Sequence, residues 1–134
     1  MIITPIKTHK ITTKDNDILT VLDTHIKKLQ DKTIVVITSK IISLSQGNVV
    51  PIKGTDKDKL IAKEADAYIP REENKYHYTL TIKNNILIPA AGIDKSNTKG
   101  NYVLWPKNPQ ECKHQLLSLE KKTTSNSAII SSVS

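Results

Sequence analysis

The sequence predicts a mixed α/β fold, with helices and strands intermixed around a mixed sheet that contains a β-hairpin. Two patterns indicate this class. Residues 33–38 (TIVVIT) form a short β-branched run, typical of a strand buried on both faces. Residues 76–83 alternate apolar and polar side chains, as a half-exposed strand does. We expect about three to four helices in a single domain that spans residues 1–134.

The first part of the chain predicts an edge strand followed by a helix. Residues 2–6 read as the strand, which Pro5 restricts to an edge or a strand start. Asp15 and Asn16 offer an N-cap for the helix. Its apolar residues recur at helical spacing and form one stripe. They are Ile18, Leu22, Ile26 and Leu29.

The middle of the chain predicts a helical turn, a weak strand and a second full helix. Residues 41–45 fit the turn, and residues 49–52 fit the strand. Thr55 and Asp58 have the spacing of a capping box, which predicts the start of the helix. Pro70 is expected to end it. The predicted buried face of this helix carries Ile61, Ala65 and Tyr68.

A β-hairpin is the clearest local prediction. Asn84 and Asn85 tolerate the positive φ angles of a tight hairpin turn. Residues 86–88 (ILI) would pair back on the preceding strand. The apolar face of that strand is expected to carry Tyr76, Tyr78, Leu80 and Ile82.

The last third predicts a strand, a helix and a final strand. Residues 101–106 form the strand, which Pro106 stops. Asn108 and Pro109 are a typical helix start, and Cys112, Leu116 and Leu119 would form the buried stripe. Residues 128–130 (AII) are the candidate final strand.

The composition limits the functional classes. The net charge of +7 comes from lysine, because Arg71 is the only arginine, and phenylalanine is absent. Sequence-reading nucleic-acid sites favour arginine forks, and single-stranded sites favour aromatic platforms. A basic nucleic-acid-binding protein therefore stays an alternative, but only a weak and non-specific interaction is expected.

The isolated titratable residues give no strong site. Cys112 stands alone on an apolar helical stripe, so we interpret it as a core residue and expect neither a disulfide framework nor a cysteine metal site. The four histidines show no paired spacing and no partner carboxylate, which favours surface residues over ligands. No apolar run approaches the roughly 18 residues that a membrane span needs, and no signal peptide is evident. We expect a cytoplasmic protein that does not contact a membrane.

The loop AAGIDKSN holds the densest group of functional side chains. Gly92 permits a positive φ or a close backbone approach. Asp94 offers a hard carboxylate, and one carboxylate together with substrate phosphates is a normal way to hold Mg²⁺. Asn97 offers a donor and an acceptor. The alternative is an Asx-turn, in which Asp94 and Asn97 satisfy only the backbone of their own loop.

These motifs resemble a known family. PAAGIDKSN followed by YVLWPKNPQE is similar to the signature region of the coenzyme F-420:L-glutamate ligase family, and its wording is closest to a bacterial branch described as folate-metabolism γ-glutamate ligases. ITSKIISLSQG resembles the family's VVxxKIVSKAEG segment, and TPIKT resembles its first loop. The resemblance runs through nearly the whole chain but covers only about the N-terminal half of the family's catalytic domain.

The resemblance implies a function and assigns residues to it. Members use GTP with Mg²⁺ or Mn²⁺ to activate a carboxylate as an acyl phosphate, which the amine of L-glutamate then attacks. Asp94 matches the first metal ligand, and Asn97 matches a nucleotide contact. Ser39 and Lys40 match a guanine-nucleotide-binding pair, although GTP and ATP stay open. The expected partners are L-glutamate, a carboxylate acceptor and, in a homodimer, a second copy of the chain.

Two departures from the family pattern predict weak or absent activity of this chain alone. Leu44 stands where the family has a lysine, and Ser132 stands where the family has the aspartate that is its second metal ligand. Relative to the family's full domain the chain is expected to be incomplete. No catalytic residue can be assigned. The alternative is a non-catalytic remnant or interaction module of the same fold.

Overall fold

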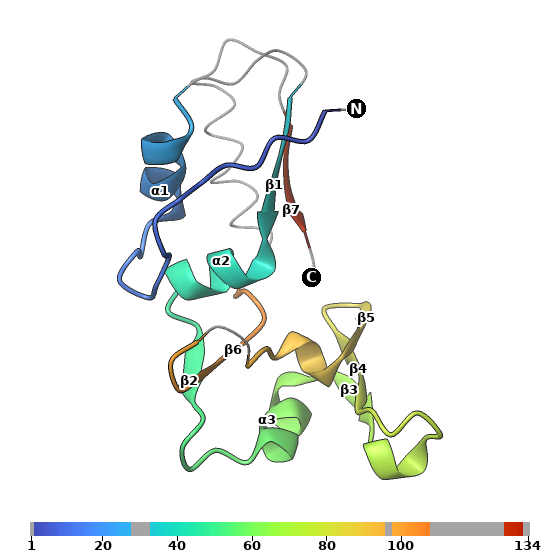
Figure 1. Ribbon diagram of the computed structural model, residues 1–134. Coiled ribbons are helices and arrows are strands. Elements are labelled where there is room, and N and C mark those ends of the chain that lie inside the picture. Colours follow the sequence, from blue (N-terminus) through green and yellow to red (C-terminus); the bar gives the residue numbers. More distant parts are fainter. Residues whose placement is uncertain (1, 28–32, 96–97, 108–127, 133–134) are drawn as a thin grey trace. The chain divides into compact units, whose positions relative to one another are not determined.

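The computed structural model describes residues 2–27, 33–95, 98–107 and 128–132 (Figure 1). They fall into two compact units, each described here by itself: Met1–Asn48 with Pro106–Ser134, and Val49–Trp105. The described elements comprise three α-helices, a parallel strand pair and two antiparallel sheets, which confirms the mixed α/β class. The single-domain organisation stays a prediction.

The first unit contains a parallel strand pair with two helices. Its elements are α1 (Ile18–His25), β1 (Ile34–Thr38), α2 (Ser39–Ser45) and β7 (Ala128–Ser132). β1 pairs with β7 in parallel, so that Ile34 lies opposite Ala128 and Thr38 opposite Ser132. Figure 1 shows the two strands side by side. The predicted final strand is therefore confirmed, and it runs two residues beyond Ile130.

The core of this unit lies on one face of β1. Val35 and Ile37 are buried and cluster with Ile18 and Val21 of α1 and Ile42 of α2. Ile34 and Val36, on the other face, are 60% and 61% exposed. Burial of this strand on both faces was therefore a wrong prediction. The described helices contribute side chains only to the Val35 face, and successive strand residues point to opposite faces.

The predicted strand at residues 2–6 is also wrong. The backbone there is in no strand, and Ile2 is 93% exposed. A short apolar run becomes a strand only when another strand satisfies its backbone groups, and Pro5 removes one of the donors it could offer.

The N-cap of α1 differs from the prediction by up to two residues. Asp17 caps the helix, and its carboxylate accepts hydrogen bonds from the Leu19 amide at 2.9 Å and the Thr20 hydroxyl at 2.7 Å. These two donors, the Thr20 hydroxyl first, lower the pKa of Asp17 below its ordinary value. Asp15 has different partners, which are described below.

The second unit holds two antiparallel sheets and one α-helix. Its elements are β2 (Val49–Pro51), α3 (Lys57–Glu64), β3 (Ala67–Ile69), β4 (Leu80–Lys83), β5 (Ile86–Pro89) and β6 (Asn101–Val103), with single 3₁₀ turns η1 (Arg71–Glu73) and η2 (Ala90–Gly92). β2 pairs with β6, and β3, β4 and β5 form a meander. The predicted hairpin is confirmed, since Asn84 and Asn85 have φ angles of 50° and 61° between the paired strands β4 and β5.

The boundaries of α3 differ from the prediction at both ends. Asp56, not Thr55, is the N-cap, and its carboxylate accepts hydrogen bonds from the backbone of residues 58 and 59. The helix ends at Glu64, well before Pro70.

Tertiary contacts explain the early end of α3. The Asp66 amide donates to the Ile82 carbonyl at 2.8 Å, and the Asp66 carboxylate accepts from the Asn84 amide at 2.6 Å. The Lys83 ammonium lies 3.0 Å from the Glu64 carboxylate and also donates to the Glu64 carbonyl. Residues 67–69 pair with β4 and form a strand. Tyr68 therefore does not lie on a buried helical face, as the sequence predicted.

β4 buries the face that the sequence predicted to be polar. Thr81 is 1% exposed whereas Ile82 is 43% exposed, and Tyr76 and Tyr78 lie outside the strand and are exposed. The reason is hydrogen bonding. The Thr81 hydroxyl donates to the Ile88 carbonyl across the hairpin and accepts from the Ala91 amide at 2.8 Å.

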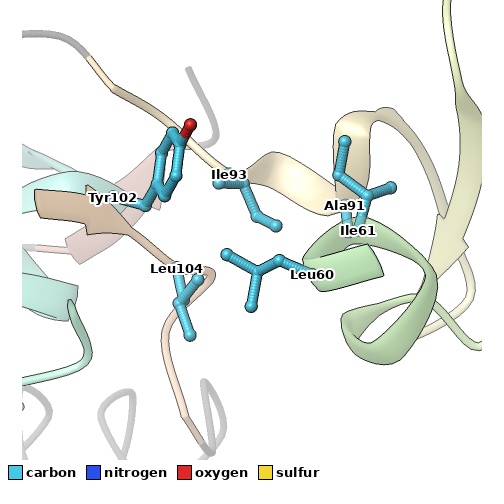
Figure 2. Close-up of a cluster of buried hydrophobic side chains, with 6 residues drawn as sticks. All are labelled: Leu60, Ile61, Ala91, Ile93, Tyr102 and Leu104. Carbon is cyan, nitrogen blue, oxygen red and sulfur yellow. The ribbon is translucent and has the colours of Figure 1, made fainter. Parts of the chain in front are cut away.

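The core of the second unit joins its helix, η2 and the β6 segment (Figure 2). Its buried members are Leu60, Ile61, Ala91, Ile93, Tyr102 and Leu104. Burial of a large apolar side chain contributes about 1.5–3 kcal/mol. The cluster therefore fixes the segment from η2 to residue 93, which leads directly into the AAGIDKSN loop. The predicted helix after Asn108 lies outside the described residues.

Thr81→Val is expected to lower the free energy of unfolding by about 1–3 kcal/mol, because the buried Ala91 amide loses its acceptor. Urea denaturation followed by circular dichroism measures this. The matched control is Thr13→Val, at an exposed position, which should change stability by less than about 0.5 kcal/mol. Equal stability of the two variants would contradict the role assigned to the Thr81 hydroxyl.

Candidate functional site

The carboxyl ends of two parallel strands form the first candidate region. Ser39 and Lys40 are the first residues of α2 and follow β1 without a linker. In the backbone register Ser132 of β7 lies opposite Thr38, the last residue of β1. Ligands of α/β proteins collect beyond the carboxyl ends of such strands. The structure thus brings the backbone positions of Ser39, Lys40 and Ser132 together, and their binding roles stay predictions.

The segment after this junction is held by a two-way amide contact. The Gln46 side chain donates to the Lys107 carbonyl and accepts from the Lys107 amide, both at 2.7 Å.

Within α2 the Ser43 hydroxyl is fully buried and makes no hydrogen bond to any described residue. Burying a polar atom in this way costs free energy. Ser43 is therefore a candidate polar group of this region that the sequence analysis missed. No motif or spacing around residue 43 distinguishes it from the other serines.

The AAGIDKSN loop begins with a left-handed turn. Ala90, Ala91 and Gly92 have φ angles of 52°, 52° and 70°. A left-handed conformation costs a residue with a side chain about 1–2 kcal/mol. Three hydrogen bonds hold the turn: from the Ala90 amide to the Thr79 carbonyl, from the Ala91 amide to the Thr81 hydroxyl, and from the Ile93 amide to the Ala90 carbonyl. Strain of this kind persists only where the surroundings over-determine it, and it clusters at ligand sites.

Asp94 is anchored through its backbone. Its amide donates to the Val103 carbonyl at 2.9 Å, and its carbonyl accepts from the Val103 amide at 2.8 Å. Further along the loop, the Thr98 hydroxyl contacts the carbonyls of Lys95, at 3.2 Å, and Asn101. The Asp94 residue itself is half-buried. Asn97 lies outside the described residues, so the choice between a ligand site and an Asx-turn stays open.

Gly92 fulfils both sequence expectations, the positive φ and the close approach. A Cβ atom at this position would lie 2.5 Å from Cε3 of Trp105 and 3.1 Å from Cδ1 of Ile88. The Trp105 ring therefore packs on the backbone two residues before Asp94, and only glycine leaves room for it.

A divalent cation shared with phosphates stays a prediction for this loop. No group of three or more His, Cys, Asp or Glu side chains in the described ranges is arranged to hold a metal ion. Asp94 alone supplies a hard carboxylate, and Mg²⁺ often uses one or two carboxylates plus substrate oxygens and water. Asp94 lies in the second unit, whereas Ser39 and Lys40 lie in the first.

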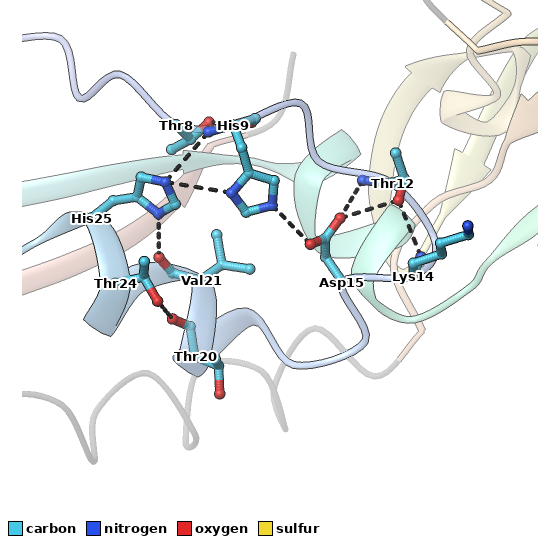
Figure 3. A network of polar contacts seen from close by, with 9 residues as sticks. All are labelled: Thr8, His9, Thr12, Lys14, Asp15, Thr20, Val21, Thr24 and His25. Atoms are coloured by element: carbon cyan, nitrogen blue, oxygen red, sulfur yellow. Dashed lines mark hydrogen bonds and ion pairs between the residues drawn. The ribbon is translucent and has the colours of Figure 1, made fainter.

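The histidines are not all isolated, which corrects the sequence interpretation. His9 and His25 are in contact, and the Asp15 carboxylate is the partner of His9 (Figure 3). Residues 9 and 25 come from a loop and a helix end, so no sequence spacing could reveal the pair. His77 is exposed, and His114 lies outside the described residues.

The basic charge is partly neutralised at its one arginine. Arg71 lies 2.9 Å from carboxylate oxygens of both Asp58 and Glu72. The Glu72 hydrogen bond and then the Asp58 charge raise the pKa of Arg71.

Among the described residues, no helix is long and apolar enough to cross a membrane.

Gly92→Ala is expected to lower the free energy of unfolding far more than Gly100→Ala. Both positions have positive φ, so both lose about 1–2 kcal/mol of backbone free energy. Only residue 92 meets the Trp105 ring, whereas nothing lies within 4 Å of the added carbon at residue 100. Overpacking should add about 1–3 kcal/mol at residue 92. Chemical denaturation of the two variants measures the difference, and equal losses would contradict the close packing.

Comparison with known protein families gave one match. A search of curated proteins found no match. The sequence model described as F420-0:Gamma-glutamyl ligase matches residues 1–132. This match covers nearly the whole chain and confirms the resemblance that the AGIDKSN and ITSKIISLSQG segments carry. The chain belongs to the F420-0:gamma-glutamyl ligase family.

Proposed function

We propose that this chain binds a nucleoside triphosphate with Mg²⁺ or Mn²⁺ and serves the formation of a γ-glutamyl amide bond. Membership of the ligase family supports the reaction class. The observation that carries the proposal is the junction of β1 and α2, where Ser39 and Lys40 follow the carboxyl end of a strand that pairs in parallel with β7.

Each candidate residue has a role that suits its chemistry. The Lys40 ammonium would neutralise negative charge on the nucleotide phosphates, and the Ser39 hydroxyl would donate a hydrogen bond to a phosphate oxygen. The Asp94 carboxylate would hold the divalent cation. Asn97 would contact the nucleotide through its side-chain amide. Rigid backbone pairing of Asp94 with Val103 supports this role, because a cation ligand must be held in place.

The proposed reaction has two steps. The terminal phosphoryl group passes from the nucleotide to the carboxylate of the acceptor, which gives an acyl phosphate and a nucleoside diphosphate. The amine of L-glutamate then attacks the acyl carbon, phosphate leaves, and an amide bond forms. The divalent cation, when bound, neutralises charge on the phosphates during transfer. The protein's own part is to position the phosphates and the acceptor.

A second candidate function is nucleotide binding without turnover, in an interaction module of the same fold. Two residues favour it. Leu44, a half-buried residue of α2, carries no charge where the family has a lysine, and Ser132 offers a hydroxyl where the family has a carboxylate. A hydroxyl is a much weaker ligand for Mg²⁺ than a carboxylate.

Asp94→Asn is expected to weaken the binding of Mn²⁺–GTP at least about tenfold, which corresponds to about 1.4 kcal/mol, and to leave metal-free GTP binding unchanged. Loss of the carboxylate charge is the reason. Fluorescence titration of a labelled GTP analogue, with Mn²⁺ and with EDTA, measures both affinities. The control is Glu73→Gln at an exposed carboxylate of η1. Equal loss with and without metal would contradict a cation role for Asp94.

Ser132→Asp is expected to strengthen Mn²⁺ binding in the presence of GTP about tenfold or more, because it supplies a carboxylate where the family has one, at the backbone position opposite Thr38. Titration of Mn²⁺ followed by electron paramagnetic resonance measures the free ion. Ser134→Asp, the same change two residues later, serves as the control. An equal gain in both variants would indicate a general charge effect and contradict the assignment of residue 132.

A further inference from the structure

The N-terminal loop and the end of α1 bring two histidines and one carboxylate together (Figure 3). Nδ1 of His9 and Nε2 of His25 lie 3.4 Å apart. Nε2 of His9 lies 2.8 Å from Oδ1 of Asp15, and Nδ1 of His25 lies 2.7 Å from the Val21 carbonyl oxygen. None of these residues belongs to the proposed nucleotide site.

The hydrogen bonds determine which nitrogen of His25 carries a proton. A carbonyl oxygen can only accept, so Nδ1 of His25 donates to Val21. Nε2 then has a lone pair in the neutral ring. The contact of the His9 amide with the same nitrogen, at 3.3 Å, agrees with this, because a backbone amide can only donate. The lone pair of His25 is therefore turned toward His9.

The Asp15 carboxylate determines the proton on His9 in the same way. Asp15 accepts hydrogen bonds from the Thr12 amide at 2.7 Å and the Thr12 hydroxyl at 3.1 Å. Together with Nε2 of His9, these donors face the two oxygens of a carboxylate, which can only accept. Nε2 of His9 must donate to it. In the neutral ring the lone pair of His9 is on Nδ1, which faces His25.

In the neutral pair the His25 lone pair has the long contact with the His9 amide, at 3.3 Å, and also faces the lone pair of His9. A positive charge between the two ring nitrogens removes the repulsion of the lone pairs. The observed spacing matches that of two nitrogens bound to one metal ion. Two imidazole nitrogens, each about 2.0–2.1 Å from a tetrahedral Zn²⁺, lie about 3.4 Å from each other. The two nitrogens here are 3.4 Å apart. The rings are tilted by 37° with centroids 5.1 Å apart, so they converge without stacking.

We propose that His9 and His25 form a two-histidine site for a first-row divalent cation such as Zn²⁺, with water in the remaining positions. Imidazole nitrogens suit this class of ion. The nitrogens that do not face the ion donate to a carboxylate and to a backbone carbonyl, which is the usual support of metal-binding histidines. The side chain of His9 is 48% exposed, so water can reach the ion.

Zinc titration of the chain, without nucleotide, tests the proposal by isothermal calorimetry. The wild type should bind Zn²⁺ at this pair. His9→Gln and His25→Gln should each weaken the affinity at least tenfold. Asp15→Asn should weaken it about 10- to 100-fold, because it removes the carboxylate that orients His9. The matched control is His77→Asn, which removes an exposed histidine of the second unit and should leave the affinity unchanged.

A measurement on the wild type keeps the test independent of the folding of the variants. Substoichiometric Co²⁺ should broaden the ring resonances of His9 and His25 before that of His77. Unchanged affinity in both glutamine variants, or earlier broadening of another histidine, would overturn the proposal. The absence of zinc binding by the wild type would also overturn it. A proton shared by the two rings would then lie between Nδ1 of His9 and Nε2 of His25. The titration contains no nucleotide, which keeps this outcome separate from that of the ligase proposal.

Discussion

The hydroxyl of Thr81 is the contact on which the second unit depends most. It bridges the hairpin at the Ile88 carbonyl and the left-handed turn at the Ala91 amide. Without it, two alanines would have to keep an unfavourable backbone conformation next to a buried amide that lacks an acceptor. This left-handed turn also places Ala91 and Ile93 in the apolar cluster with α3. The backbone of Asp94 follows directly and pairs with Val103.

The candidate ligand regions share one construction, in which polar side chains extend from backbone that other contacts hold. Ser39 and Lys40 begin a helix whose far end is tied to Lys107 through Gln46. Asp94 is held by strand pairing and by the turn before it. The histidine pair is oriented by Asp15 and Val21. Such support is what a binding site needs, because a loosely held ligand group loses affinity.

Local sequence patterns predicted the elements whose hydrogen bonds are local. The Asn84-Asn85 turn, a helical segment at residues 41–45 and the start of α1 within two residues of the predicted cap are examples. Patterns failed where a distant partner decides the outcome. Residues 67–69 join a strand and not a helix because β4 lies beside them, and residues 2–6 stay outside any strand because no described strand pairs with them. Thr81 is buried because its two partners come from later in the chain.

The sequence by itself determined the class of fold, the family and the residue types at the candidate nucleotide site, since the AGIDKSN and SK motifs are read without coordinates. Only the tertiary structure placed Ser132 beside the end of β1, brought the Trp105 ring onto Gly92 and joined His9 to His25. The physical reason is separation along the chain. Periodicity and capping report interactions over a few residues, whereas these contacts join residues between 13 and 94 positions apart and form only when the chain folds.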